Sequence, residues 1–393
     1  MTKRILLIEA SADNVGGSYV SLYNLAKTLD KRKYRPHVVF YGHNPYIRLL
    51  RKCGIRVHIL RHKGTTEKMG EKQLERFGKR ILCVKPNEDN PSSQLYRSLA
   101  KIKRILFTSL PEAIELKSII SENKIDIIHS NGNLTWSLSS VLASVLTRKP
   151  YVLHLRQFVC IGFIEKMMIA RTSSVICISK AIHYCLIKQG ISKTKLKIEY
   201  NVLDVNKFRP GPSRRGKKIG IIGRLVDWKG HRVFLEAARI VLNHCSDAEF
   251  IIAGTGPEES NLKRIAKDLK VTNSVHFVGY VNNVARLLIN IDLVVNCSIG
   301  PEPFGRSIIE AMAMKKPVIA ATTGGATEIV QDKITGYIVP PNDPQALADK
   351  MLTLLRDELQ QKKMGEAGRK VVEQNFDNKR CTEQIEGTYN KIS

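Results

Sequence analysis

The sequence predicts an α/β protein built from two Rossmann-like domains. Short continuous apolar runs such as Ile5–Ile8 alternate with amphipathic helical segments, and the runs end in polar or glycine residues. Continuous apolar runs are typical of buried parallel strands, and their alternation with helices predicts a doubly wound sheet. The alternation restarts after a stretch at 210–218 that is rich in Pro, Gly and basic residues. At 393 residues the chain is long enough for two cores.

The first half contains the following predicted elements. Strands are expected at 5–8, 37–40, 57–60, 125–129, 151–154 and 174–179, and helices after residue 18 and at 46–52, 94–106, 111–123 and 180–188. Gly16 and Gly17 precede the first helix, where bare N–H groups and the helix dipole favour an anion, although a plain turn is the alternative. Asn131 is expected in a loop, Ser130–Asn133, that follows the fourth strand. Residues 61–91 lack apolar periodicity and are expected to form a long loop.

The second half repeats the pattern. Strands are expected at 219–222, 250–253, 275–278, 293–295, 317–321 and 336–339, and helices at 231–243, 259–269, around Glu310, after Asp343 and after Asp377. Asp343 followed by Pro344 predicts an N-cap with proline at the first helical position. We therefore predict a first domain at 1–208, a linker at 209–218, a second domain at 219–376, and a final helix at 377–393 that packs back on the first domain.

Composition limits the class of protein. The apolar content is 43% and no apolar run approaches the roughly 20 residues that a spanning helix needs, so we expect a cytoplasmic protein without signal peptide or anchor. The eight cysteines are scattered without Cys-x2-Cys spacing, which favours reduced thiols.

The positive charge is concentrated in the first half. Residues 1–200 carry 35 Lys and Arg against 14 Asp and Glu, whereas residues 201–393 carry 28 against 22. We expect the first domain to dock on an anionic membrane surface, at the inner face of the plasma membrane. The candidate contacts are Arg76, Lys79, Arg80, Arg97, Lys101 and Arg104. The alternative is charge spread over solvated faces, with the 94–106 helix packed on the core.

The stretch 292–330 carries the chemistry. It reads strand, loop, helix, strand and glycine turn, the order in which a doubly wound sheet builds a nucleotide crevice at the carboxyl ends of its strands. Glu302 lies in the loop and Glu310 in the helix, and on spacing alone both are explained equally well as solvated surface acids. Arg224 and Lys229 follow the first strand of the second half, where two cations suit a diphosphate leaving group.

The string Glu302-Pro303-Phe304-Gly305-Arg306-Ser307-Ile308-Ile309-Glu310 resembles the Glu-x7-Glu signature of glycosyltransferase family 4. The resemblance covers nearly the whole chain. Similar stretches are Gly16-Gly17-Ser18, Asp126-Ile127-Ile128-His129, Asn201, Gly223-Arg224-Leu225 with Lys229-Gly230, Ala253-Gly254-Thr255-Gly256-Pro257, and Gly324-Gly325 with Glu328. It implies the GT-B fold, two facing Rossmann-like domains with an interdomain cleft. It also implies a hexosyltransferase that moves a sugar, with retention, from a nucleotide-sugar to a glycan or lipid-linked acceptor in cell-surface polysaccharide or glycolipid biosynthesis.

The resemblance also implies roles for individual residues. Arg224 and Lys229 would hold the diphosphate, Glu310 the ribose hydroxyls and Glu302 the transferred sugar. The implied donor site also includes Gly16, Gly17, Phe304 and Gly305. The catalytic set would be Glu302, Arg224, Lys229 and Asn131.

Three positions depart from the family pattern. Many members carry His-x-His where this chain has His129-Ser130-Asn131, and an amide cannot exchange a proton near neutral pH. Either Asn131 or His154 could take the place of the second histidine. Val202 stands where a glycine is usual, and Arg306 adds a cation expected to lie beside the phosphates.

The sequence argues against a metal cofactor and against nucleic acid. It contains no Asp-x-Asp, so the diphosphate metal of other glycosyltransferases has no evident ligands, and no cofactor is expected. Aromatic residues make up 6% of the chain and do not interleave with the basic ones, which disfavours a nucleic-acid-binding module. Within GT-B enzymes, a sugar-nucleotide epimerase or a phosphorylase remains an alternative.

Overall fold

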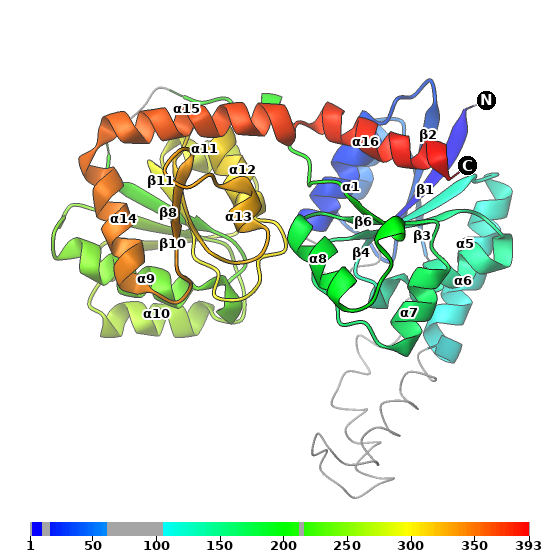
Figure 1. Ribbon diagram of the computed structural model, residues 1–393, viewed down its shortest axis with the longest axis horizontal. Coiled ribbons are helices and arrows are strands. Elements are labelled where there is room, and N and C mark those ends of the chain that lie inside the picture. The colour runs from blue at the N-terminus through cyan, green and yellow to red at the C-terminus, as the bar shows by residue number, and fades with distance from the viewer. Residues whose placement is uncertain (1, 10–15, 61–104, 212–215, 393) are drawn as a thin grey trace, which may run out of the picture. The chain divides into compact units, whose positions relative to one another are not determined.

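The chain forms two compact α/β units in its computed structural model, whose described residues are 2–9, 16–60, 105–211 and 216–392 (Figure 1). The first unit comprises Met1–Ile176, Gln189–Lys197 and Glu386–Ser393, and the second comprises Cys177–Lys188 and Ile198–Ile385. Each unit is a parallel sheet with helices packed against it, as the alternating sequence pattern predicts.

The first unit contains a seven-stranded sheet in the order β3-β2-β1-β4-β5-β6-β7. Its strands are β1 (Lys3–Glu9), β2 (Tyr34–Phe40), β3 (Arg56–Ile59), β4 (Ile127–Gly132), β5 (Tyr151–Leu155), β6 (Ser174–Cys177) and β7 (Leu196–Ile198). Its helices are α1 (Gly17–Thr28), α2 (Tyr46–Lys52), α5 (Leu110–Glu122), α6 (Leu138–Thr147) and α7 (Phe163–Ala170). The strand order reverses between β1 and β4, which pair in parallel.

The second unit contains a six-stranded sheet in the order β10-β9-β8-β11-β12-β13. Its strands are β8 (Lys218–Ile222), β9 (Glu249–Ala253), β10 (Val275–Gly279), β11 (Leu293–Asn296), β12 (Val318–Ala321) and β13 (Gly336–Val339). Its helices are α8 (Lys180–Lys188), α9 (His231–Leu242), α10 (Glu259–Asp268), α11 (Val284–Ile289), α12 (Arg306–Ala313), α13 (Ala326–Ile329), α14 (Pro344–Arg356), α15 (Glu358–Asn375) and most of α16 (Asn378–Lys391). Here the order reverses between β8 and β11.

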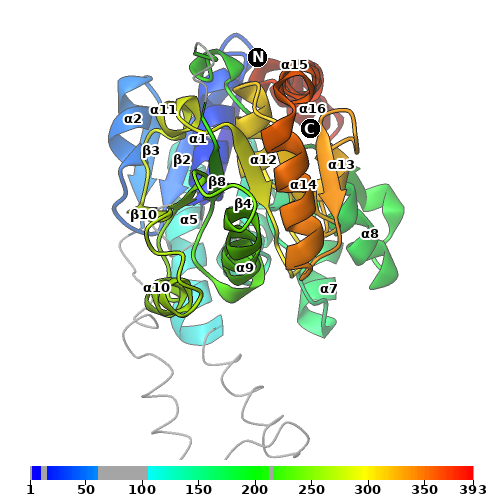
Figure 2. The same cartoon turned by 90° about the vertical axis from the view of Figure 1, so that its left-hand side faces the viewer.

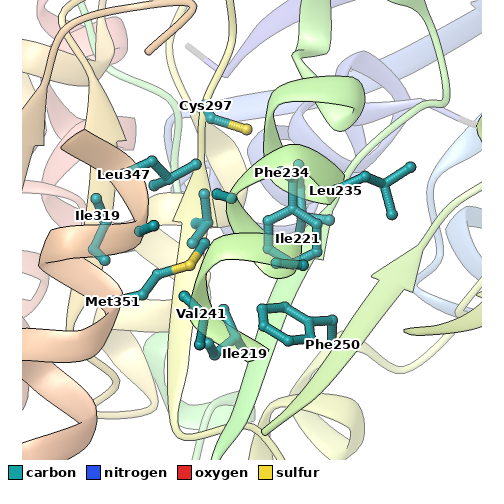
Figure 3. Close-up of a cluster of buried hydrophobic side chains, with 14 of the residues drawn as sticks. Ile219, Ile221, Phe234, Leu235, Val241, Phe250, Cys297, Ile319, Leu347 and Met351 are labelled. Carbon is teal, nitrogen blue, oxygen red and sulfur yellow. The ribbon is translucent and has the colours of Figure 1, made fainter. Parts of the chain in front are cut away.

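One face of the second sheet is covered by α9 and α14, which lie alongside each other in Figure 2. Ile219 and Ile221 of β8 point into this layer (Figure 3). The rings of Phe234 of α9 and Phe250 of β9 pack edge to face, with 5.7 Å between their centroids. Alternation along a strand sends every second side chain to one face, which explains why Ile219 and Ile221 share this core. The core fixes the strands whose carboxyl ends carry the predicted site.

The sequence located most elements and the limits of some of them. The helices at 46–52 and 180–188 and the strand at 336–339 have the predicted bounds, and Ser179 caps α8 by accepting from Ile182 N at 3.2 Å. The strand predicted at 125–129 instead runs from Ile127 to Gly132. The predicted loop at 61–91 and residues 94–104 of the predicted 94–106 helix lie outside the described residues.

The first unit ends earlier in the chain than the predicted boundary at 208. Hydrogen bonds explain why the following segment joins the second unit: Leu203 N donates to Phe376 O at 2.9 Å, and Arg369 Nη1 donates to Phe208 O at 2.6 Å. Part of the predicted linker, 212–215, lies outside the described residues. At the other end of the chain, Tyr389 of α16 is buried in the first unit and contacts His129 at 2.6 Å.

Candidate active site

In the second unit, two loops meet where the strand order reverses. One follows β8 and contains Trp228, and the other follows β11. Ile299 N and Gly300 N donate to Trp228 O at 2.8 and 3.1 Å. Gly230 has a φ of +73°, and a Cβ there would lie 2.0 Å from Cys297 O. Only glycine permits this approach without strain, so residue 230 holds the two loops together.

Glu302 lies at the centre of this junction and is 4% exposed. Lys229 Nζ lies 2.5 Å from its Oε2, Ser298 Oγ donates to the same oxygen at 2.9 Å, and Asn296 Nδ2 lies 3.5 Å from it. The structure therefore brings together Lys229 and Glu302, which the sequence predicted as separate members of one site. A buried carboxylate with a cation and two polar donors has a fixed position and orientation.

The glycine turn after β12 packs against the Glu302 loop. Gly325 N donates to Glu302 O at 2.8 Å. Gly324 has a φ of +50°, and a Cβ there would lie 2.1 Å from Glu302 O. Phe304 is buried against Tyr200 and Phe376, with ring centroids 6.0 and 5.7 Å away. Gly305 follows with a φ of +100° and begins α12 as its N-cap.

Glu310 is buried on α12 and forms an ion pair with Arg306, one turn earlier, at 2.7 Å between Nε and Oε1. Burial raises the pKa of Glu310, and the guanidinium of Arg306 opposes that shift. The structure pairs Arg306 with Glu310, and its placement beside the phosphates stays a prediction. Its Nη1 is nevertheless buried without a hydrogen-bond partner among the described residues, which leaves one donor for a ligand.

Arg224 is exposed on the loop after β8. Leu225 N donates to Thr255 O at 3.0 Å, which ties this loop to the turn after β9. Gly254 has a φ of +143°, and a Cβ on it would lie 1.9 Å from Gly223 O. This glycine therefore serves loop packing, which fixes the backbone on both sides of Arg224.

In the first unit, Glu9 and Asn131 meet where β1 and β4 are in register. Glu9 is fully buried, and its Oε2 accepts a short hydrogen bond from Asn131 Nδ2. Asn131 Oδ1 accepts from Arg156 Nε at 2.7 Å, and Nδ2 also contacts Ser18 O at 3.2 Å. Asn131 thus lies inside β4 rather than in a loop, because strand pairing to β1 and β5 continues through it.

Sequence reasoning did not identify Glu9 as a site residue. The available signal was its position, an acid directly after the apolar run of the first strand. The carboxyl end of a central strand next to the order reversal is where open α/β sheets bind ligands. Glu9, Asn131 and Arg156 therefore form a connected polar group at that point.

Two buried histidines adjoin this group. His129 Nδ1 lies 2.6 Å from Tyr389 Oη, and His129 Nε2 lies 3.2 Å from His154 Nδ1. Burial, with Arg156 adding to it, lowers the pKa of His129 to about 3 and lowers the pKa of His154 in the same direction. Both rings are therefore neutral at physiological pH. His154 Nε2 is buried without a partner in the described residues, and His154 lies in register with Asn131.

Gly16 and Gly17 lie at the start of α1. Gly16 is the N-cap with an extended φ of −159°, and a Cβ there would meet only Ser18 Oγ, at 4.0 Å. The fold therefore does not itself require glycine at position 16. Contact between these glycines and an anion stays a prediction.

Possible metal ligands do not cluster within the described ranges. No group of three or more His, Cys, Asp or Glu in them could hold a metal ion. The described cysteines are all free thiols: Cys53, Cys160, Cys177, Cys185, Cys245, Cys297 and Cys381. No helix among the described residues is long and apolar enough to cross a membrane.

Two family models match consecutive parts of the chain. The model described as Glycosyl transferases group 1 matches residues 204–371, and the one described as Glycosyltransferase Family 4 matches residues 15–207. The capsular polysaccharide biosynthesis glycosyltransferase CapM of Staphylococcus aureus is 25% identical over 88% of this chain and 92% of its own length. The N-acetyl-alpha-D-glucosaminyl L-malate synthase of Bacillus anthracis is 36% identical, but over only 36% of this chain and 37% of its own length.

Solved structures show the same fold. HepE of Anabaena in complex with UDP has a TM-score of 0.76 and 23% identity, and the match covers 99% of this chain and 100% of that one. A glycosyltransferase from Rickettsia africae has a TM-score of 0.77 and 24% identity, with 100% and 98% covered. Together with the two family models and the Glu302-to-Glu310 loop and helix, these likenesses show that the chain belongs to the group 1, family 4 glycosyltransferases with the GT-B fold.

Proposed function

We propose that this glycosyltransferase moves a hexose from a nucleoside-diphosphate sugar to a glycan or lipid-linked acceptor, with retention at the anomeric carbon. The observation that carries the proposal is the Lys229–Glu302 pair at the carboxyl ends of β8 and β11. A fixed cation beside a buried, hydrogen-bonded carboxylate suits a sugar diphosphate, because one group contacts the phosphate charge and the other the sugar hydroxyls.

Each proposed role follows from what surrounds the residue. Lys229, which also lies 4.4 Å from the Trp228 ring centroid, neutralises charge on the departing diphosphate together with Arg224. Glu310 accepts hydrogen bonds from the ribose, with Arg306 Nη1 as an adjacent donor. UDP is the nucleotide in the HepE complexes, so UDP-sugars are the first donors to test.

We propose that the acceptor hydroxyl attacks the face from which the diphosphate leaves, with a leaving phosphate oxygen taking the proton. Asn131 then positions a hydroxyl and transfers no proton, because an amide does not titrate near neutral pH. The two neutral histidines, His129 and His154, keep a hydrogen-bonding role. No metal is needed in this scheme, since Arg224 and Lys229 supply the positive charge.

Activity assays test this reaction directly. The protein is incubated with UDP-, GDP- and ADP-sugars and a lipid-linked or glycan acceptor. Nucleoside diphosphate release is measured with and without EDTA, and the product anomer is assigned by NMR. We expect equal release with and without EDTA, and an anomeric configuration that matches the donor. Product without nucleoside diphosphate would instead favour a phosphorylase or an epimerase, and an inverted anomer would refute retention.

We also propose that the protein acts at the cytoplasmic face of a membrane. The predicted basic contacts lie outside the described residues, but Phe107 in the turn before α5 and Leu110 and Ile114 of α5 are exposed apolar side chains. Exposed apolar side chains on a unit rich in positive charge favour an anionic lipid surface. Co-sedimentation with anionic vesicles should weaken between low and physiological salt. Equal binding to neutral vesicles, or none to either, would leave a soluble acceptor as the better proposal.

A further inference from the structure

The first unit contains a pocket at the end of the sheet opposite Glu9. It has a volume of about 390 Å³ and lies at the amino ends of β1, β2 and β3. Its lining residues include Arg4, Arg35, His37, Arg56, Glu122 and Asn123. Arg4 precedes Glu9 by five residues of one strand, which is about 17 Å at 3.3 Å per residue. The pocket is therefore separate from the Glu9–Asn131 group.

Strand register places the basic side chains on one face of the sheet. Arg4 pairs with Arg35, and His37 pairs with Arg56. Residues in register on parallel neighbours point to the same face, and so do residues two apart on one strand. Three guanidinium groups and an imidazole from three adjacent strands therefore share one surface.

This arrangement places three guanidinium groups and one carboxylate around the same pocket. Like charges on neighbouring strands repel each other. Glu122 is the single acid in the lining, and none of the three guanidinium groups forms an ion pair with a carboxylate of the described residues. Arg4 Nη1 donates to Asn123 O at 2.9 Å, and Arg56 Nη1 donates to Asn123 Oδ1 at 2.7 Å. Neutral acceptors thus orient two arginines and leave their charge available.

The pKa of His37 responds to the positive charge of these arginines. Its ring stacks on His58 with 5.7 Å between centroids, and Nδ1 lies 3.4 Å from His58 Nε2. Burial and then, in decreasing order, the charges of His58, Arg56, Arg4 and Arg35 together lower the pKa of His37 to about 4. An anion in the pocket would oppose the arginines and raise this pKa.

We propose that this pocket binds a multiply charged oxyanion of the phosphate class. Arginine presents a planar fork of donors that matches phosphate oxygens, and several such forks on one rigid sheet fix the anion in place. The volume exceeds that of one phosphate, so a diphosphate or the phosphate of a larger molecule also fits. The site is independent of the proposed glycosyl transfer.

Calorimetric titration with inorganic phosphate and pyrophosphate at constant ionic strength tests the site. We expect saturable one-to-one binding, weakened at least tenfold in Arg35→Glu and in Arg56→Glu. Arg48→Glu on α2 is the matched control, because it reverses an exposed charge of the same unit outside the pocket lining. Circular dichroism and thermal melting establish that each variant is folded. No binding in the wild type, or equal weakening in the Arg48→Glu control, would overturn the proposal.

An NMR titration gives a second readout that folding defects do not mimic. Saturating pyrophosphate should raise the pKa of His37 above about 4 in the wild type and leave it unmoved in Arg35→Glu. The groups that face His37 and enter this titration are Arg4, Arg35, Arg56, His58 and Glu122. An unmoved His37 at pyrophosphate saturation would place the anion elsewhere and refute the site.

Vesicles distinguish the source of the phosphate group. Binding to phosphatidic acid vesicles that free pyrophosphate displaces, and that Arg35→Glu abolishes, would assign the pocket to a lipid headgroup. Binding of free pyrophosphate without such vesicle binding would assign it to a soluble phosphate compound. Both outcomes support an oxyanion site, and absence of both overturns it.

Discussion

Lys229 Nζ lies 2.5 Å from Glu302 Oε2, although 73 residues separate them in the chain. The pair joins the loop after β8 to the loop after β11, at the point where the strand order of the second sheet reverses. Glu302 is nearly fully buried there, and its carboxylate contacts Lys229 and accepts a hydrogen bond from Ser298. The pair therefore couples the stability of the site to its proposed chemistry.

Lys229→Ala is expected to lower turnover roughly a hundredfold, since it removes a preorganised cation from the diphosphate. It should also lower the thermal midpoint, because a buried carboxylate loses its partner. Adding Glu302→Gln should recover part of that midpoint without recovering activity. Lys263→Ala is the control, because its pair with Glu259 is exposed and contributes little. Full activity in a folded Lys229→Ala protein would remove this residue from the donor site.

Glu310→Gln should separate function from folding. The amide oxygen still accepts from Arg306 Nε. The substitution also removes a carboxyl group whose pKa is raised by burial. We expect an unchanged or higher thermal midpoint near pH 7 together with roughly a hundredfold lower turnover, through loss of the proposed charge-assisted ribose contact. Turnover in the donor assay and thermal melting measure the two effects. A variant that loses stability and activity in parallel would indicate a structural role only.

Asn131→Asp should make the first unit pH-sensitive. A second carboxylate would then face the buried carboxylate of Glu9, and mutual repulsion would raise the pKa of one of them above that of the unfolded chain. Stability is then present at low pH and lost as pH rises. We expect the midpoint difference from wild type to be large at pH 7.5 and smaller at pH 5.5. Asn206→Asp, at an exposed position, should show no such trend.

Gly324→Ala should abolish activity by displacing Glu302. Its Cβ would overlap Glu302 O, and its φ of +50° disfavours any side chain. Gly279→Ala is the control, since residue 279 has a φ of +68° but open space around its Cβ. The control should cost only about 1–2 kcal/mol for the left-handed backbone. Equal effects of the two substitutions on turnover would show that the contact of residue 324 with the Glu302 loop does not determine activity.

The buried, neutral His231 is expected to make the protein less stable at acid pH. Burial lowers the pKa of His231 from 6.5 to about 4, and neither ring nitrogen has a partner among the described residues. A histidine with a lowered pKa contributes stability above 6.5 that is lost as pH falls toward 4, at about 1.4 kcal/mol per pH unit. The thermal midpoint of His231→Leu should therefore fall less than that of the wild type between pH 6.5 and 4.5. An equal fall of the midpoint in both proteins would contradict this assignment.

The sequence determined the strands and the chemistry-bearing loop by itself. Apolar runs such as Ile5–Ile8 and Leu293–Val295 specify buried strands through local composition, and both are strands in the structure. The Glu302-to-Glu310 string is likewise local, so it identified the family and the loop and helix that carry both acids. Extension of β4 through Asn131 was not predictable in this way, because pairing with β1 and β5 overrides the polar character of Ser130 and Asn131.

Only the tertiary structure decided which distant groups meet. Lys229 and Glu302 come from the loops after two different strands, whereas Glu9 and Asn131 and the three arginines of the Arg4–Arg35–Arg56 pocket come from different strands. Strand order and register set these contacts, and both depend on how whole sheets pack their cores rather than on any short stretch. The sequence thus specified the residues available for chemistry. The order reversals at β8/β11 and β1/β4 specified which of them face each other.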